Sequence, residues 1–240
     1  MGRAQSKKIL FALALNTIIL LVTMVLMVMG FHAVWIGCLC VFGTTLVTLF
    51  YQNGWNQKTV AAFLTLVIVA IFMSVLVWFV CTRAGVYGLN ERTWEEDEIS
   101  ILDLHVHINM LHVSYVAVLL SLIGAAKDSA IAVATGTFET FCCDPQMGRW
   151  EAFQSGMNIG KDILGVTINT LLFAAIGESL LLIQMYFDCA YSFAEFINSE
   201  SLFQAAIVFL AGGIGIELSI PISAWVMSVL CTRHGNIMVP

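Results

Sequence analysis

Asp128 is the residue whose type and place most directly predict chemistry in this chain. It follows Lys127 within residues 110–134, an otherwise apolar stretch that is long enough to cross a bilayer. A carboxylate at such depth costs at least ~2.5 kcal/mol on insertion scales, so it is kept where it has a partner or a function. Asp128 is therefore a candidate site for a proton or a small cation.

A second group of polar side chains recurs at helical spacing around the start of a later apolar stretch. Four residues at i, i+4, i+7 and i+11 fall on one helix face and form what we call the polar stripe: Asn158, Asp162, Gly165 and Asn169. Gly156 and Gly160 have the small-xxx-small spacing that lets two helix backbones approach closely. Gly124, four residues before Asp128, offers a similar notch. We therefore expect these helices to meet other helices closely.

Two interpretations of Asp128 follow from this pattern. In the first, Asp128 and the polar stripe bind a proton or small cation and change partners as it moves, with Asp162 and the two asparagine amides as ligands. In the second, Lys127 extends to the inner membrane interface and Asp128 forms a static ion pair with Lys161. The spacing alone leaves both interpretations open.

Two more carboxylates, Glu178 and Glu217, lie deep in apolar segments. Glu217 stands among glycines and before Pro221, which would bend a helix and let backbone oxygens line a path. A structural role in helix association is the alternative for both acids. The additional candidates for the ion site are therefore Lys127, Lys161, Glu178 and Glu217.

Patterns for enzymatic catalysis and cofactor binding do not occur in the sequence. It contains no Gly-x-Ser-x-Gly, His-Glu-x-x-His or Walker pattern, so it offers no nucleophile, catalytic metal or phosphate cradle of these kinds. Its seven cysteines show neither Cys-x-x-Cys nor Cys/His spacing, and no basic tract indicates nucleic acid binding. We expect neither an enzyme nor a metal or cofactor.

The composition predicts the elements that position these residues. Hydrophobic residues make up 60% of the 240 residues and charged residues 11%, whereas a soluble domain has roughly 45–50% and 25%. The chain is therefore predicted to be an all-α, polytopic integral membrane protein that contacts membrane lipid. About six apolar stretches are long enough to span a bilayer: residues 9–29, 32–50, 60–81, 110–134, 163–187 and 203–231. They form a single transmembrane domain.

The distribution of basic residues predicts the orientation. One set of span ends carries seven basic residues, and the opposite set carries Arg83 and Arg92; the seven are Arg3, Lys7, Lys8, Lys58, Arg149, Lys161 and Arg233. The excess places both termini in the cytoplasm. At ~1.5 Å per residue, Asp128 would lie about 9 Å from an inner end at residue 134, with Asp162 at a similar level.

Several motifs extend beyond these single residues. They are LIGAAKDSAI at 122–131, SGMNIGKDILGVTINTL at 155–171, NSE at 198–200, GGIG at 212–215 and the pair Ile220-Pro221. Together they closely resemble the YibE/YibF family of bacterial membrane proteins. Members of the YibE type have an additional N-terminal anchor and extracytoplasmic segment, so this chain is more similar to the shorter YibF type. The resemblance implies the bacterial plasma membrane and a hetero-oligomer with a YibE-like partner chain.

A more distant resemblance concerns the order of the elements around Asp128. The order resembles half of the membrane domain of RND transporters and SecD/SecF proteins. It consists of a descending span with a Gly-x-x-x-Asp pattern, a cytoplasmic loop, an ascending span and a last span with proline. This implies that Asp128 takes part in proton coupling and that a partner chain supplies the other half.

Two functions are therefore open at this point. The first is a subunit of a two-component complex that transports an unknown substrate coupled to an ion or proton. The alternative is a non-catalytic scaffold or assembly subunit whose buried charges hold helices together.

Overall fold

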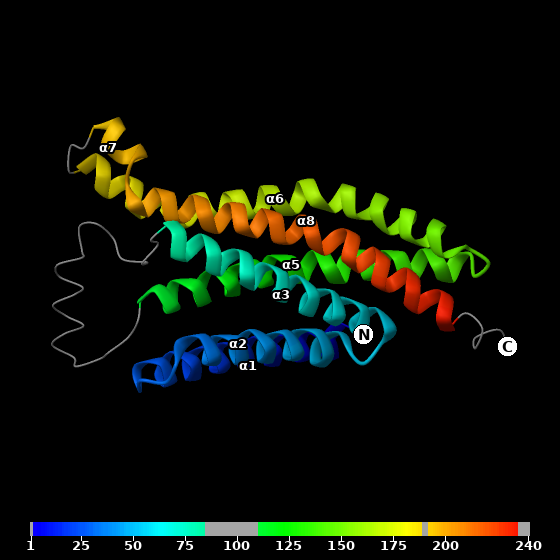
Figure 1. Cartoon of the computed structure of the whole chain (residues 1–240). Coiled ribbons are helices and arrows are strands. Elements are labelled where there is room, and N and C mark those ends of the chain that lie inside the picture. Colours follow the sequence, from blue (N-terminus) through cyan, green and yellow to red (C-terminus); the bar gives the residue numbers. More distant parts are fainter. Residues whose placement is uncertain (1, 85–109, 189–191, 235–240) are drawn as a thin grey trace.

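The computed structural model of the chain is helical throughout residues 2–84, 110–188 and 192–234, apart from short connections, and these described residues contain no strand (Figure 1). Residues 1, 85–109, 189–191 and 235–240 lie outside the described structure. Arg92, one of the two basic residues counted for the outer side, is among them. The predicted all-α class is confirmed.

Six long helices within the described residues are apolar enough to cross a membrane. Their bounds are α1 Gly2–Val28, α2 Ala33–Leu46 continued by the π-helix η1 Val47–Gln52, α3 Gln57–Ala84, α5 Met110–Cys143, α6 Arg149–Asp188 and α8 Glu200–His234. A short helix, α7 Phe193–Ile197, precedes α8. The chain is therefore a polytopic membrane protein with the six spans that hydropathy predicted.

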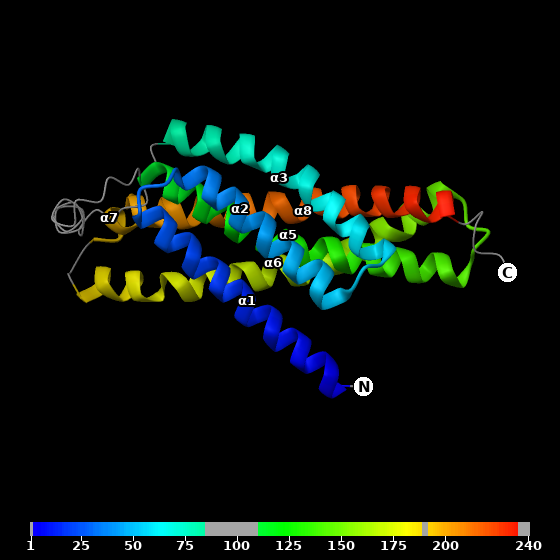
Figure 2. The same cartoon turned by 90° about the horizontal axis from the view of Figure 1, so that it is seen from below.

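The helix α5 is the centre of the bundle. It packs against α2, α3, α6 and α8, while α1 packs mainly against α2 and η1 at the edge. Figure 2 shows the N-terminal half of α1 turning away from the other helices. Both termini lie at the same end of the bundle, as six spans require (Figure 1). That this end faces the cytoplasm stays a prediction.

Two helices extend well beyond the spans that hydropathy indicated. α5 continues nine residues past 134 to Cys143, and α6 begins at Arg149, 14 residues before 163. Hydropathy detects only the apolar part of a helix, whereas these polar turns stay helical because they pack against each other: Gly136 approaches Ile159 and Gly156 approaches Thr137. Asp128 is consequently 15 residues, roughly 22 Å, from the end of its helix, instead of about 9 Å.

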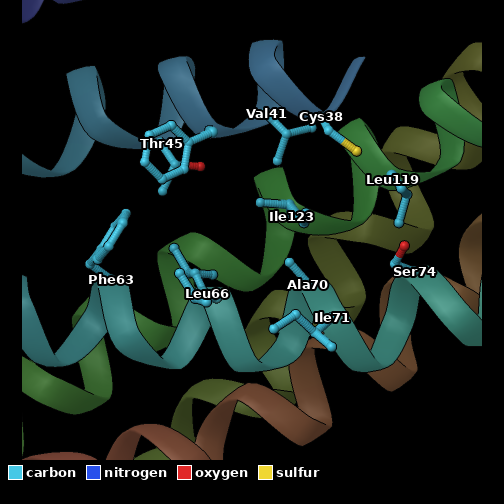
Figure 3. A pocket seen from close by; sticks show the side chains of 12 residues that line it. Cys38, Val41, Thr45, Phe63, Leu66, Ala70, Ile71, Ser74, Leu119 and Ile123 are labelled. Atoms are coloured by element: carbon cyan, nitrogen blue, oxygen red, sulfur yellow. The ribbon is translucent and has the colours of Figure 1, made fainter. Parts of the chain in front are cut away.

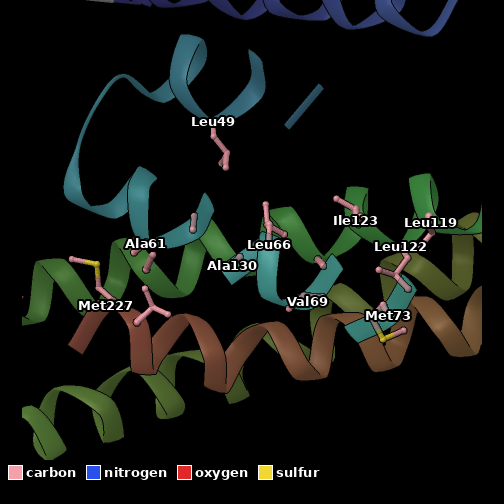
Figure 4. Close-up of a cluster of buried hydrophobic side chains, with 14 of the residues drawn as sticks. Leu49, Ala61, Leu66, Val69, Met73, Leu119, Leu122, Ile123, Ala130 and Met227 are labelled. Atoms are coloured by element: carbon pink, nitrogen blue, oxygen red, sulfur yellow. The ribbon is translucent and has the colours of Figure 1, made fainter. Parts of the chain in front are cut away.

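The core lies between α3, α5 and α8 and also includes Leu49 of η1 and Ala152 of α6 (Figure 4). Its largest fully buried side chains include Leu49, Val69, Met73, Leu122 and Met227. Lipid is as apolar as these side chains, so close packing and hydrogen bonds between helices, rather than escape from water, hold them together. One such bond joins α8 to α5, where the hydroxyl of Ser223 donates to the backbone oxygen of Ala130 at 2.8 Å.

Glycines allow α6 to pack closely against α8. A Cβ atom on Gly156 would lie 2.7 Å from the Cβ of Ala224, and one on Gly160 would overlap the side chain of Ile220. The small-xxx-small prediction for Gly156 and Gly160 is therefore confirmed. By contrast, a Cβ on Gly165 would meet nothing within 4 Å.

We predict that Gly160→Ala lowers the melting temperature of the detergent-purified protein by roughly 2–10 °C, because overpacking of this kind costs about 1–3 kcal/mol. Gly165→Ala is the matched control on the same helix. It should be neutral or slightly stabilising, because alanine favours a helix over glycine and the site has room. Equal melting temperatures for the two variants would contradict the close approach of α6 to α8.

Candidate functional site

The exposed side of α5 is a single line of small and polar residues. Between His112 and Phe141 the exposed residues of this helix are Ala117, Ser121, Asp128 and Glu139. Their spacings of 4, 7 and 11 residues place them on one line along the helix. We call this the α5 line. A surface that faces lipid at this depth is normally apolar, so the α5 line is suited to water or to another protein.

Asp128 lies at the middle of the candidate span His112–Cys143, which has 32 residues. Among the described residues it makes no hydrogen bond, and no cationic nitrogen lies within 4.0 Å of its carboxylate. The ion pair found among the described residues joins Lys58, at the start of α3, to Glu139, near the end of α5, at 4.0 Å. The structure thus holds an unpaired carboxylate at mid-depth, without the pairing to Lys161 that the second interpretation requires.

Lys127 points away from its neighbour in the sequence. Adjacent residues in a helix are about 100° apart, and the Lys127 ammonium faces the α1–α2 hairpin, where it donates to the hydroxyl of Thr48 at 3.4 Å. It does not extend along α5 toward the inner interface, which was the second interpretation's expectation. The two neighbouring charges therefore serve different surfaces of α5.

The polar stripe is exposed along its whole length. Asn158, Asp162, Gly165 and Asn169 are all exposed, whereas Gly156 and Gly160 on the other side of α6 are buried against α5 and α8. The most apolar window of this helix contains no buried residue. The stripe therefore meets no other helix within the described part of the chain.

The contacts between α5 and α6 fix the relative depths of the polar groups. The two helices are antiparallel and Gly136 lies opposite Ile159. Asp128 lies eight residues before Gly136, and Thr167 lies eight residues after Ile159. Because the helices are antiparallel, Asp128 is level with Thr167. Asp162 is then level with Val133, roughly 7 Å nearer the termini, and Asn169 lies slightly beyond Asp128. The groups are staggered, with Asp128 between Asp162 and Asn169, and no hydrogen bond or ion pair links them.

The additional carboxylates lie elsewhere. Glu217 is exposed in the middle of α8, which continues as a helix through Pro221. It stands two residues, about 200°, from Gly215, which faces Leu122 of α5, so it points away from Asp128. Glu178 is exposed near the far end of the span Arg149–Leu180, and Lys161 is exposed without an ion pair among the described residues.

Sequence reasoning missed Asn16 and Thr48. The Asn16 amide donates to the Thr48 hydroxyl at 3.0 Å, and that hydroxyl also receives Lys127. An asparagine at the middle of the first span was the signal that could have identified this contact. Its partner is 32 residues away, at the start of a π-helix, a rare element that often marks functional sites.

A cavity of about 290 Å³ lies between α2, α3 and α5 (Figure 3). Its lining is apolar apart from Cys38, Thr45 and Ser74. The residues seen in Figure 3 carry no charge, so this cavity suits an apolar occupant such as a lipid acyl chain rather than an ion. The described residues also contain no group of three metal-ligating side chains.

We predict that Asp128→Asn changes the stability of the isolated chain by less than about 1 kcal/mol, because the carboxylate has no partner to lose. A thermal melt in detergent measures this. Loss of a buried ion pair with Lys161 would instead cost roughly 3–5 kcal/mol, and Lys161→Met in the same chain would recover part of it. That second outcome would support the static ion pair.

Comparison with known proteins identifies the family of the chain. Neither a curated protein nor a solved structure matches it significantly, so the resemblance to RND and SecD/SecF proteins stays a prediction. A family model described as YibE/F-like protein matches residues 1–233. Because this match covers nearly the whole chain, the chain belongs to the YibE/F-like family.

Proposed function

We propose that the chain is one subunit of a two-component complex in the bacterial plasma membrane that transports its substrate coupled to a proton or small cation. Asp128 is the titrating group. The observation that carries the proposal is the α5 line, an exposed strip of small and polar residues that has an unpaired carboxylate halfway along the candidate span His112–Cys143.

The position of Asp128 argues against exposure to lipid. Insertion scales give at least ~2.5 kcal/mol for a charged aspartate at this depth, and among the described residues no lysine or arginine nitrogen lies within 4.0 Å of the carboxylate. Ser121 and Ala117 continue the line without bulky apolar groups. Water in a path along α5 would solvate the carboxylate and let it gain and lose protons.

The polar stripe supplies the other ligands. Asp162 and Asn169 lie on either side of the level of Asp128, and Asn158 lies one turn beyond Asp162. Amide oxygens and carboxylates are suitable ligands for a proton or a hard cation. A staggered arrangement supports movement from one ligand to the next in place of a single fixed site.

The exposed stripe also supports a partner. Polar side chains within membrane spans face a bundle interior or a water-filled cavity, and none of the described helices covers the stripe. A second chain that packs against α5 and α6 would enclose both the α5 line and the stripe. A YibE-like chain is the partner that we propose, and the proposal assigns no enzymatic step to either subunit.

The test is ion flux in proteoliposomes that contain the chain and its YibE-like partner. We expect a proton or cation flux that Asp128→Asn abolishes, because an amide does not titrate. Glu139→Gln is the matched control: it removes one acid from the same line, near the end of α5, and should leave most of the flux. Asp162→Asn should reduce the flux without abolishing it.

Full flux in Asp128→Asn would overturn the assignment of the titrating group. If no flux occurs and Asp128→Asn instead separates the two chains in detergent, the subunit is a scaffold. Size-exclusion chromatography of the pair distinguishes that outcome from loss of transport in an intact complex.

A further inference from the structure

A second cavity lies beside the apolar one and shares Val41, Thr45 and Ile123 with it. It has a volume of about 180 Å³ and is lined by α1, α2 and α5, with Asn16, Thr44, Thr45, Gly124 and Lys127 among the lining residues. Asn16 and Lys127 both stand at the middle of their spans. The cavity therefore places a cationic group and an amide at mid-depth, on a different face of α5 from Asp128.

The hydrogen bonds of Thr48 fix how these groups are oriented. Its hydroxyl donates to the backbone oxygen of Thr44 at 2.8 Å, so its hydrogen is committed. The Thr48 oxygen then only accepts, from the Asn16 amide nitrogen at 3.0 Å and from the Lys127 ammonium at 3.4 Å. The Asn16 amide must therefore present its NH₂ group to Thr48, and its oxygen faces the other way.

This arrangement leaves three bonding positions open. The Asn16 side-chain oxygen is buried and has no hydrogen-bond partner. The Lys127 ammonium has three N–H groups, and Thr48 is the one acceptor found for it among the described residues. No carboxylate oxygen of the described chain lies within 4.0 Å of it. The site thus lacks two acceptors, one donor and one negative charge.

We propose that the cavity binds a small monovalent oxyanion that carries a hydrogen, of which bicarbonate is the simplest. Its oxygens accept from Lys127, and its hydroxyl donates to the Asn16 oxygen. Chloride or nitrate would supply the charge but leave Asn16 without a donor, and a water molecule would supply the hydrogen bonds but no charge. Gly124 leaves room, because a side chain there would meet nothing within 4 Å.

This site is independent of the proposed function. It uses neither the α5 line nor the polar stripe, and its ligand has the opposite charge to a proton or cation. Failure of the flux experiment would leave it unaffected, and its own failure would leave the assignment of Asp128 unaffected.

The test compares bicarbonate with nitrate, which has the same charge and planar shape but no hydrogen. Each anion is titrated into the detergent-purified chain in chloride-free gluconate buffer near pH 8, and the melting temperature reports binding. We expect the wild-type chain to bind bicarbonate about five-fold more tightly than nitrate, the contribution of roughly one hydrogen bond. Asn16→Leu should remove that preference while weak binding of both anions persists.

Lys127→Met should lower the binding affinity for both anions by roughly ten-fold to hundred-fold, because it removes the charge-assisted hydrogen bonds. Lys161→Met is the matched control, since it deletes one exposed lysine elsewhere and should leave both affinities unchanged. Equal affinities of the wild-type chain for bicarbonate and nitrate, or unchanged binding by Lys127→Met, would overturn the proposal. If Lys127→Met does not fold, the anion preference of Asn16→Leu still decides the question.

Discussion

The close packing of α5 is the constraint on which the rest of the structure depends. A helix surrounded by α2, α3, α6 and α8 has little surface left, and what remains is the line through Ala117, Ser121, Asp128 and Glu139. Glycines make this packing possible: Gly136 admits Ile159 of α6, and Gly215 admits Leu122 of α5. Without these close approaches α5 would have a broader exposed side, and its polar residues would be diluted among apolar ones facing lipid.

The same constraint separates Lys127 from Asp128. Neighbours in sequence are normally expected to neutralise one another in a membrane, but the 100° step between them carries Lys127 toward the α1–α2 hairpin. There the Thr48 hydroxyl meets it, at the point where α2 changes into a π-helix. Each charge is therefore left to find a partner outside the described chain or in solvent. This argues for two ion-binding surfaces in preference to one internal salt bridge.

Much of the fold could be predicted from residue patterns. There is a physical reason why the remaining features could not be predicted. The apolar stretches predicted six helices, and the spacing of Gly156 and Gly160 predicted the close face of α6. The helices extend beyond the predicted spans because hydropathy measures only the apolar length, whereas α5 continues by packing to Cys143. The depth of Asp128 relative to Asp162 depends on which residues meet, Gly136 with Ile159, and the contact of Asn16 with Thr48 depends on how the hairpin closes. Neither is encoded in local periodicity.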